Sequence, residues 1–420
     1  MNVPPATIVR RLLPVVRDRM NHTPVLLIEG PRGVGKSTLL AQLAADLQTH
    51  VIDFDNEDVL EFSRSNPTLA TDSDKPILID EYQKEPRVLG WIKSRLNKGT
   101  SFGMFVLAGS TSFDSLPPGI QSLTGRLQRL TIGPFTQTEL DATDSRFLLR
   151  AFDGDLGHTA TPAATTRAEY VARIMRGGMP LALAQPTAAR REAWFRSHIN
   201  QSLDRDAGQL RRLGRKAELP RLLTRAAGQT ASLLKTTRVA ADLDLSPKTT
   251  IAYLELLESL FLIGTLPAWG STVSSRSLAT PKIHIIDSGL GSHLLRLSQA
   301  KLDRRDPSSL TEFGHLLESF AVQELLRHAD WLDDPVTAGH WRTKDDEEVD
   351  LVLERYDGAI VAVEVKAADH IESKWLTPLK KLRDRIGNRF VAGIALHLGP
   401  RGYQADDRIH TVPLERLWTQ

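Results

Sequence analysis

A glycine-rich stretch at residues 30–37 restricts the fold of this chain more than any other feature. The stretch reads Gly30-Pro31-Arg32-Gly33-Val34-Gly35-Lys36-Ser37, and it follows the apolar run Val25-Leu26-Leu27-Ile28. A helical pattern begins at Lys36, so a buried strand, a glycine-rich turn and a helix come in succession. This is the context of the P-loop motif, G-x-x-x-x-G-K-[ST], whose backbone N–H groups curl around phosphate oxygens. The sequence therefore predicts a site for a nucleoside triphosphate.

The residues of this loop have separate expected roles. Residues Gly30 to Thr38 are expected to surround the phosphates of ATP, helped by the partial positive charge of the helix N-terminus. Lys36 is expected to reach the β- and γ-phosphates, and the Ser37 hydroxyl to coordinate Mg²⁺. The alternative is a chance match in a tight turn, and the coincidence of strand, turn and helix argues against it.

Length and composition limit the class of protein. A chain of 420 residues is expected to form about two to four domains. Its 41% hydrophobic and 25% charged residues are usual for a soluble globular protein, and its net charge of +2 confines any nucleic-acid surface to a local patch. The absence of cysteine excludes disulfides and thiolate sites. Without a membrane-length apolar run or a signal-peptide core, we expect a cytoplasmic protein with no membrane partner.

Apolar runs alternate with helical spacing over the first 140 residues, which predicts an α/β fold with a parallel sheet and helices on both faces. The candidate strands cover residues 25–28, 51–55, 76–81, 104–110 and 127–132. Ligands bind at the carboxyl ends of such strands. The polar residues at these ends are Glu29, Asp80, Glu81 and Ser110.

The pair Asp80-Glu81 closes an apolar strand and is typical of a Walker B motif. Asp80 would hold Mg²⁺ directly or through water, and Glu81 would polarise the attacking water. An isolated Asp-Glu pair is also common at a solvated strand end. Its distance from a P-loop favours the catalytic role.

Four segments carry a family resemblance. They are Gly30–Ser37, the Asp-Glu-x-Gln-Lys-x-Pro motif within Ile79–Pro86, Leu107–Ser110, and the Gly-Arg to Pro-Phe run within Leu123–Phe135. Together they resemble the prokaryotic AAA-type ATPases that carry a C-terminal domain of unknown function with a nuclease-like core. The resemblance covers nearly the whole chain. It implies an AAA-type fold and a homo-oligomer, such as a hexameric ring, but leaves the substrate open.

The resemblance also implies two further site residues. Ser110 falls where related ATPases keep a polar residue near the γ-phosphate. Arg126 is a candidate for an arginine finger on the γ-phosphate of a neighbouring subunit. Arg129 is the rival candidate, and a surface ion pair is the alternative role for Arg126.

The middle of the chain is predicted to be helical. A helical lid is expected over residues 160–225, and its Gly177-Gly178-Met179-Pro180 turn also resembles the family. The basic run 211–216 is either a solvated helix face or a phosphate contact.

Residues 226–295 predict a winged helix-turn-helix. One helix is expected over residues 233–245, and Ser246-Pro247 starts the next, with an apolar face of Ile251, Leu254, Leu257 and Leu260. The residues expected in a DNA groove are Lys248, Thr249, Thr250 and Tyr253. The alternative is a helix pair for packing or oligomer contact.

Residues 305–420 predict a second chemical site. Asp350 lies in the strand 348–353, and Glu364 and Lys366 share a face of the strand 360–366. This order resembles the PD-(D/E)xK nucleases, in which carboxylates hold a divalent metal that activates water and the lysine assists. Glu318, on a helix, would add a carboxylate. Two charges in an apolar strand are costly unless paired or used.

Three roles remain open for this C-terminal set: cleavage, a DNA-binding domain without cleavage, and a structural Glu–Lys ion pair. Trp341, Arg342 and Lys344 precede the acidic strand and are candidates for contact with a nucleic-acid backbone.

Taken together, these motifs predict an oligomeric ATPase that moves or remodels DNA, for instance branched DNA, with a C-terminal module that binds or cuts the strand. One alternative is a nucleotide-dependent regulatory or defence switch whose partner is a protein. Another is a metal-dependent nuclease gated by ATP.

Overall fold

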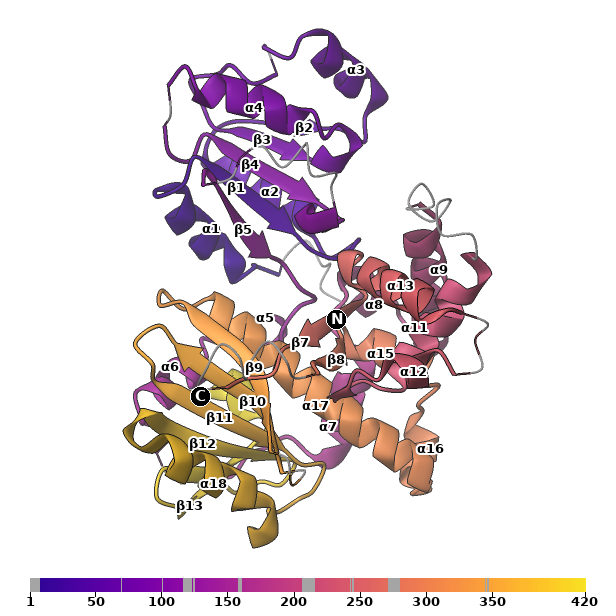
Figure 1. The fold of residues 1–420 in the computed structure, drawn as a ribbon, viewed down its shortest axis with the longest axis vertical. Coiled ribbons are helices and arrows are strands. Elements are labelled where there is room, and N and C mark those ends of the chain that lie inside the picture. The colour runs from indigo at the N-terminus through magenta and orange to yellow at the C-terminus, as the bar shows by residue number, and fades with distance from the viewer. Residues whose placement is uncertain are drawn as a thin grey trace. The chain divides into compact units, whose positions relative to one another are not determined.

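The computed structural model describes residues 8–420 apart from several short gaps. The residues outside the description are 1–7, 69, 100, 116–122, 124, 158–160, 206–215, 242, 244, 271–279, 344 and 346. The chain divides into two compact units (Figure 1). The first holds Met1–Pro134 and Ser259–Phe261, and the second holds Phe135–Glu258 and Leu262–Gln420. The predicted core of residues 1–140 thus runs slightly past the first unit, and the three predicted later domains fall together in the second.

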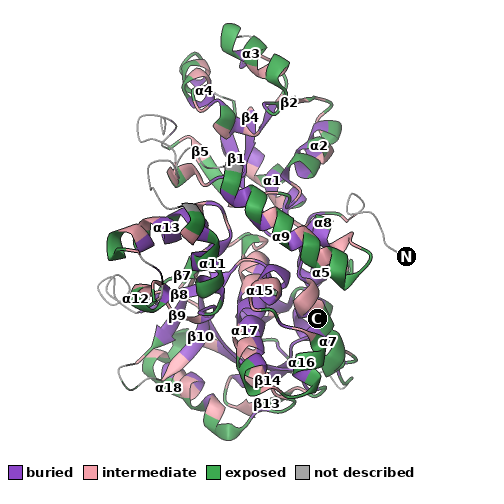
Figure 2. Cartoon of the chain, turned by 90° about the vertical axis from the view of Figure 1, so that its right-hand side faces the viewer, coloured by how far each residue is buried: buried purple, intermediate pink, exposed green. Residues whose placement is uncertain are grey.

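A five-stranded sheet forms the centre of the first unit. Its strands are β1 (Val25–Glu29), β2 (Val51–Asp53), β3 (Ile77–Asp80), β4 (Phe105–Gly109) and β5 (Leu127–Thr131), in the spatial order β2-β3-β4-β1-β5. All neighbouring strands run parallel, which confirms the predicted parallel sheet. β1 and β4 are buried at every residue, as Figure 2 shows, because both of their faces are covered.

Helices of the first unit supply this cover. They are α1 (Leu12–Met20), α2 (Lys36–Asp46), α3 (Glu57–Ser65) and α4 (Val88–Leu96). On one face, Leu89 of α4 packs in a common cluster with Leu27 of β1 and Leu107 of β4. Alternate residues of a strand point to opposite faces, so Leu26 points to the other face, where it is also buried.

A six-stranded mixed sheet dominates the second unit. Its strands are β9 (Val336–Arg342), β10 (Glu348–Arg355), β11 (Ile360–Val365), β12 (Phe390–His397), β13 (Tyr403–Asp406) and β14 (Ile409–Pro413), in the order β13-β14-β12-β11-β10-β9. β9, β10 and β11 are antiparallel, whereas β11, β12 and β14 are parallel. The helix α17 (Pro307–Asp330) packs on one face, and α18 (Thr377–Ile386) packs on the other.

The second unit contains further helices. They are α5 (Gln137–Leu140), α6 (Phe147–Phe152), α7 (Arg167–Arg176), α8 (Pro180–Leu183), α9 (Ala188–Arg205), α15 (Ser288–Leu294), α16 (Gln299–Asp303) and α19 (Arg416–Thr419). Within the described ranges, no helix is both long and apolar enough to cross a bilayer.

A smaller module in the second unit combines helices with a three-stranded antiparallel sheet. In chain order its elements are α11 (Leu219–Ala227), β6 (Ser232–Leu233), α12 (Thr236–Val239), α13 (Pro247–Ser259), β7 (Ile263–Leu266) and β8 (Lys282–Ile285). The sheet order is β6-β8-β7. The predicted long helix over 233–245 is wrong, because Leu233 pairs with Lys282 in the sheet and α12 is short.

The helix α13 begins as predicted, and three of the four residues of its predicted apolar face, Leu254, Leu257 and Leu260, are buried. The Ser246 hydroxyl accepts a hydrogen bond from the Thr249 N–H at 3.1 Å, which confirms the predicted cap. Thr250 and Tyr253, predicted to face DNA, are fully buried, whereas Ile251 is 47% exposed. A three-residue step stops about 60° short of a full turn, so a longer series spaced by three drifts around the helix, and Ile251 at its start falls outside the buried face.

Distant parts of the second unit are joined around α19. The Ser145 hydroxyl donates to the Leu417 carbonyl at 2.7 Å, across a separation of 272 residues. Trp418 is buried, meets the ring of Tyr170 edge-on, and lies beneath the guanidinium of Arg173. The core of this unit therefore needs segments from both ends of its sequence.

Candidate functional site

The glycine-rich loop joins β1 to α2, as the sequence predicts. Gly35 adopts a φ of +103°, in the left-handed region that favours glycine, and α2 starts at the next residue. A side chain at Gly30 would place its Cβ only 2.1 Å from the carbonyl oxygen of Ile132, so only glycine fits there. The loop geometry thus depends on these two residues.

Lys36 lies at the centre of the loop. Its ammonium group donates to the carbonyls of Gly30 and Pro31, both at 2.9 Å. Burial lowers the pKa of Lys36 to about 8, although the charges of Glu81 and Asp80 oppose this shift. The side chain is therefore held beside both acidic residues.

Ser37 and Asp80 lie next to each other across the loop. The Ser37 hydroxyl hydrogen-bonds the Asp80 carboxylate, and burial is the largest cause that raises the pKa of Asp80. A hydroxyl and a carboxylate are oxygen ligands of the kind that Mg²⁺ prefers, so the pair fits the predicted ion. Such an ion, when bound with ATP, would neutralise phosphate charge.

Glu81 is held in a strained backbone conformation beside Ser110. Its φ is +51°, which is uncommon for a residue with a side chain and often marks a functional position. The Ser110 hydroxyl donates to the Glu81 carboxylate at 3.2 Å, and Gln83 donates to the same oxygen. Gln83 also donates to the Ser110 hydroxyl at 3.1 Å. These bonds orient the carboxylate.

Gln83 is therefore a site residue to which the sequence reasoning assigned no role. It lies in the short helix η2 (Tyr82–Lys84). The absence of a side chain at Gly109 leaves room for Gln83. A Cβ at Gly109 would lie 2.7 Å from the Gln83 amide oxygen and 2.5 Å from the Tyr82 ring. The sequence could have identified Gln83 as a site residue, because in the motif Asp-Glu-x-Gln the glutamine follows the acidic pair by two residues.

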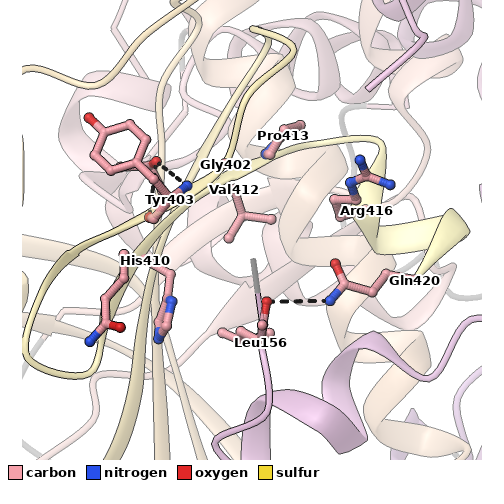
Figure 3. A pocket seen from close by; sticks show the side chains of 11 residues that line it. Leu156, Gly402, Tyr403, His410, Val412, Pro413, Arg416 and Gln420 are labelled. Carbon is pink, nitrogen blue, oxygen red and sulfur yellow. Dashed lines mark hydrogen bonds between the residues drawn. The ribbon is translucent and has the colours of Figure 1, made fainter. Parts of the chain in front are cut away.

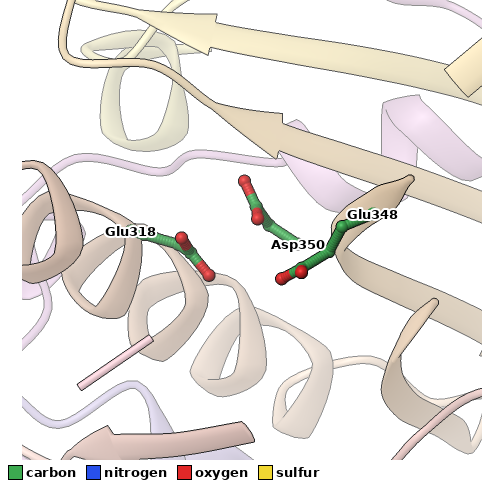
Figure 4. A group of neighbouring side chains, drawn as sticks. All are labelled: Glu318, Glu348 and Asp350. Atoms are coloured by element: carbon green, nitrogen blue, oxygen red, sulfur yellow. The ribbon is translucent and has the colours of Figure 1, made fainter. Parts of the chain in front are cut away.

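A group of three carboxylates forms a second candidate site, in the second unit. Glu318 of α17 and Glu348 and Asp350 of β10 point toward one another (Figure 4), and each offers an oxygen within 4.8 Å of the others. A bulge interrupts the pairing of β10 between Val349 and Val352, and such bulges re-aim side chains. We call Glu318, Glu348 and Asp350 the acidic cluster.

This cluster differs from the predicted metal set in one member. Glu348 belongs to it and Glu364 does not, although Asp350 and Glu318 are present as predicted. Glu348 precedes Asp350 by two residues. Because side chains alternate between the two faces of a strand, this spacing could have identified Glu348 from the sequence.

Lys282 of β8 places its ammonium group within the acidic cluster. It lies 2.6 Å from Glu318 and 3.0 Å from Asp350, and it also pairs with Glu348. Its side chain is 1% exposed. A divalent metal therefore does not fit the cluster while Lys282 is in place.

Glu364 and Lys366 form an ion pair beside the cluster. Burial and the charge of Asp350 raise the pKa of Glu364 to about 8, and Glu364 Oε2 has no hydrogen-bond partner among the described residues. Opposing charges raise the pKa of Lys366 despite its burial. Glu364 therefore takes up a proton at a higher pH than an ordinary carboxyl group.

This raised pKa predicts a pH effect on stability. The folded protein holds the Glu364 proton above the usual pKa of 4.5, so the free energy of unfolding should fall as the pH rises from about 4.5 to 8. The fall is at most about 1.4 kcal/mol per pH unit. Glu364→Gln removes this titration, so urea unfolding at pH 5, 7 and 9 should give a shallower pH dependence for the variant. If the free energy of unfolding depends on pH equally in the natural protein and in the variant, Glu364 is not the group that titrates.

Three residues before β10 are predicted to contact a nucleic-acid backbone, and their surroundings in the structure differ. Trp341 is 5% exposed and packs in a core cluster with Trp269, so its predicted contact with nucleic acid is wrong. Arg342 donates to Glu348 at 2.7 Å. Lys344 lies outside the described residues.

Comparisons with known families agree with the geometry of the loop. Residues 22–141 match the family described as AAA domain. Most of the first unit therefore matches the AAA domain family. Residues 167–301 and 313–417 match two families described as domains of unknown function, DUF8612 and DUF4143.

Two mycobacterial proteins resemble nearly the whole chain. Uncharacterized protein Rv2008c of Mycobacterium tuberculosis and uncharacterized protein Mb2031c of Mycobacterium bovis are each 25% identical over 409 residues, which is 96% of this chain and 83% of each relative. Among solved structures, the Walker-type ATPase PABY2304 of Pyrococcus abyssi is 14% identical, with 69% of this chain and 95% of that chain covered and a TM-score of 0.41. The RuvB Holliday junction branch migration motor of Thermotoga maritima is 17% identical, with 60% and 89% covered and a TM-score of 0.29.

The two candidate arginine fingers of the AAA domain occupy different places. Arg126 precedes β5, which runs parallel to β1, so it lies at the end of the sheet opposite to the P-loop. It donates to Asn97 at 2.7 Å. Arg129 instead pairs with the buried Glu29 at 2.6 Å and with Asp114 at 2.8 Å. Arg126 is therefore too distant to reach the nucleotide of its own subunit.

Arg10 also supports the P-loop of the AAA domain. It is buried and donates to the carbonyl of Val34, and its guanidinium nitrogen would lie 3.8 Å from a Cβ at Gly35. Nothing in the local sequence distinguishes Arg10 from Arg11, so sequence patterns did not identify it.

Beyond the AAA domain, two of the family-like segments meet in the second unit, close to Asp287. The buried Asp287 carboxylate accepts hydrogen bonds from the N–H groups of Gly178 and Leu290, at 2.7 and 2.8 Å. Phe135 donates its N–H to the Gly178 carbonyl at 2.8 Å. The Gly-Gly turn and the segment around Asp287 therefore have a structural role.

A small hollow lies between residues 156–157 and the C-terminal strands (Figure 3). Its volume is about 20 Å³, and its lining includes Tyr403, His410 and Arg416. This volume holds about one water molecule, so the hollow is too small for a cofactor.

Proposed function

We propose that this protein hydrolyses ATP. The observation that carries the proposal is the orientation of Glu81, whose carboxylate is fixed by Ser110 and Gln83. Lys36 would bind the β- and γ-phosphates, and Ser37 and Asp80 would bind Mg²⁺. Glu81 would accept a proton from the attacking water.

The direct test is ATP turnover by the full chain, measured as phosphate release with Mg²⁺. Lys36→Ala should abolish nucleotide binding, because the loop loses its only predicted phosphate-binding ammonium group. Turnover that persists in this variant would show that another site or a contaminant is responsible.

We further propose that the protein acts on DNA. The order helix, strand, helix, helix, strand, strand over α11 to β8 supports a winged helix-turn-helix. Three exposed cations, Lys235, Arg238 and Lys248, lie on or next to α12 and the start of α13. They suit contact with the phosphate backbone, which dominates non-specific affinity.

DNA binding is tested by fluorescence anisotropy with linear, single-stranded and four-way-junction DNA, beside ATPase assays in the same buffers. Lys248→Ala should weaken binding and reduce the salt slope of log K by about 1. The control is Lys374→Ala, because that lysine is 71% exposed and lies far along the chain on η6 (Ser373–Leu376). No binding at low salt, together with ATP turnover that DNA does not stimulate, would exclude the DNA proposal.

A protein partner is the second candidate, and a specific observation favours it. The exposed face of α13 carries Ile251 and Glu255 beside Lys248. An apolar and an acidic side chain suit a protein surface better than a phosphate backbone. Under this alternative, Ile251→Asp changes ATP turnover in the presence of the partner and leaves DNA affinity unchanged.

We also propose that Arg126 acts on the site of a neighbouring subunit in a homo-oligomer. Its position opposite to the P-loop end of the sheet supports a role between subunits. Mixing Arg126→Ala with Lys36→Ala protein should restore part of the ATP turnover, since some interfaces then combine an intact P-loop with an intact arginine. No recovery in mixtures that still associate would argue against this role.

A further inference from the structure

The acidic cluster contains a cation from the protein itself. The Lys282 ammonium group lies between Glu318 and Asp350, and Glu348 completes the surrounding carboxylates. We propose that Lys282 is the permanent cation of the acidic cluster and occupies the position that a divalent metal takes in a nuclease. The C-terminal domain then acts without a metal in this site. This inference is independent of ATP hydrolysis.

The electrostatics of the site favour its two ammonium groups. Lys282 and Lys366 supply two positive charges, and neighbouring opposite charges raise the pKa of both. Burial and the charge of Asp350 raise the pKa of Glu318 well above its usual value and raise the pKa of Glu364 to about 8. Lys282 instead holds the pKa of Asp350 below its usual value despite burial. The two ammonium groups therefore face the carboxylates of the site without a metal.

The position of Lys282 is fixed by its strand. Lys282 and His284 alternate along β8 onto one face, and both meet α17. Lys282 contacts Glu318, while His284 hydrogen-bonds Ser319 at 3.0 Å. Thr230 hydrogen-bonds the same Ser319 hydroxyl at 2.7 Å and accepts from the Ile285 N–H. Two successive residues of α17 therefore anchor the strand that carries the lysine.

A second contact holds the same small sheet against β9. The Trp269 N–H donates to the His340 carbonyl at 2.6 Å, and the His340 N–H donates to the Pro267 carbonyl at 2.9 Å. The His340 ring also hydrogen-bonds the Thr280 carbonyl at 3.0 Å. These bonds all involve residues of the segment that leads into β8, so they hold the strand that carries Lys282 against β9.

A metal and the ammonium group exclude each other. Mg²⁺ binds oxygens at about 2.0–2.1 Å in a near-octahedral shell, which needs the space between the carboxylates. Lys282 already fills this space at hydrogen-bond distances. Two cations in one buried site would also repel each other strongly.

The test measures Mn²⁺ binding to nucleotide-free full-length protein by electron paramagnetic resonance. We expect that the acidic cluster of the natural protein binds no Mn²⁺. Lys282→Met removes the ammonium group and keeps the bulk, so the variant should gain one bound Mn²⁺ per chain. Adding Asp350→Asn should remove that ion again, and the control Lys374→Met, at an exposed lysine, should gain none.

Two outcomes would overturn the proposal. The first is Mn²⁺ binding to the natural protein that Asp350→Asn abolishes. The second is a folded Lys282→Met protein that binds no Mn²⁺, since the carboxylates would then not form a metal position. If Lys282→Met does not fold, thermal unfolding of the natural protein with and without Mn²⁺ decides, because a bound ion must raise the melting temperature. If the proposal is correct, any increase in melting temperature with Mn²⁺ is the same in the natural protein and in the Asp350→Asn variant. An increase that Asp350→Asn removes would overturn it.

Discussion

Glu81→Gln should retain ATP binding and lose ATP turnover by about 10²–10⁴-fold, the range usual for general base catalysis. The amide keeps the shape of the side chain and its contacts with Ser110 and Gln83, but it cannot accept a proton from water. Binding is measured with a fluorescent nucleotide analogue, and turnover by phosphate release.

Glu61→Gln provides the matched control, since Glu61 is an exposed carboxylate on α3 of the same AAA domain. It should leave both quantities unchanged. Full ATP turnover by the Glu81→Gln protein would show that Glu81 is not the general base. Ser110 and Gln83 would then not serve to orient a catalytic carboxylate.

Gly178→Ala should destabilise the second unit by about 3–5 kcal/mol, at the upper end of single-residue effects. The new Cβ would lie 2.2 Å from the carbonyl oxygen and 2.8 Å from the nitrogen of Phe135. Both atoms belong to the backbone, so a rotamer change cannot relieve the overlap. The hydrogen bonds of Gly178 with Phe135 and Asp287 would also be disturbed.

Gly314→Ala tests the same chemical change where space is open. Gly314 lies in α17 with no atom within 4 Å of the added Cβ, so the variant should gain about 0.5–1 kcal/mol from helix propensity. Urea unfolding followed by circular dichroism measures both variants. Equal stabilities for the two would contradict the role of the Gly178 turn.

The nucleotide-binding half could be predicted because its determinants are local. The five strands, the P-loop and the Asp80-Glu81 pair are each defined within a few residues of sequence, and the parallel sheet brings the carboxyl ends of the strands together. The orientation of Glu81 by Ser110 could not be predicted in the same way, because the contact spans 29 residues and depends on side-chain geometry.

The second half shows where periodicity fails. Tyr253 and Thr250 look suited to a DNA groove by type, yet they are buried, because an amphipathic residue fits either environment. Lys282 lies 36 residues from Glu318 and 68 from Asp350. No spacing rule links a lysine in one small sheet to carboxylates on a separate helix and strand, so only the assembled fold reveals that the predicted metal position contains an ammonium group.

The contact of Ser145 with Leu417 has a consequence for synthesis in the cell. A ribosome adds about 5–20 residues per second, so roughly 14–54 s separate the two partners, which lie 272 residues apart. The AAA sheet, complete by Thr131, can fold during this time. The apolar side chains of α6 and α7 must wait for β10 to β14 and Trp418. We expect the nascent second unit to depend on chaperones that cover such surfaces.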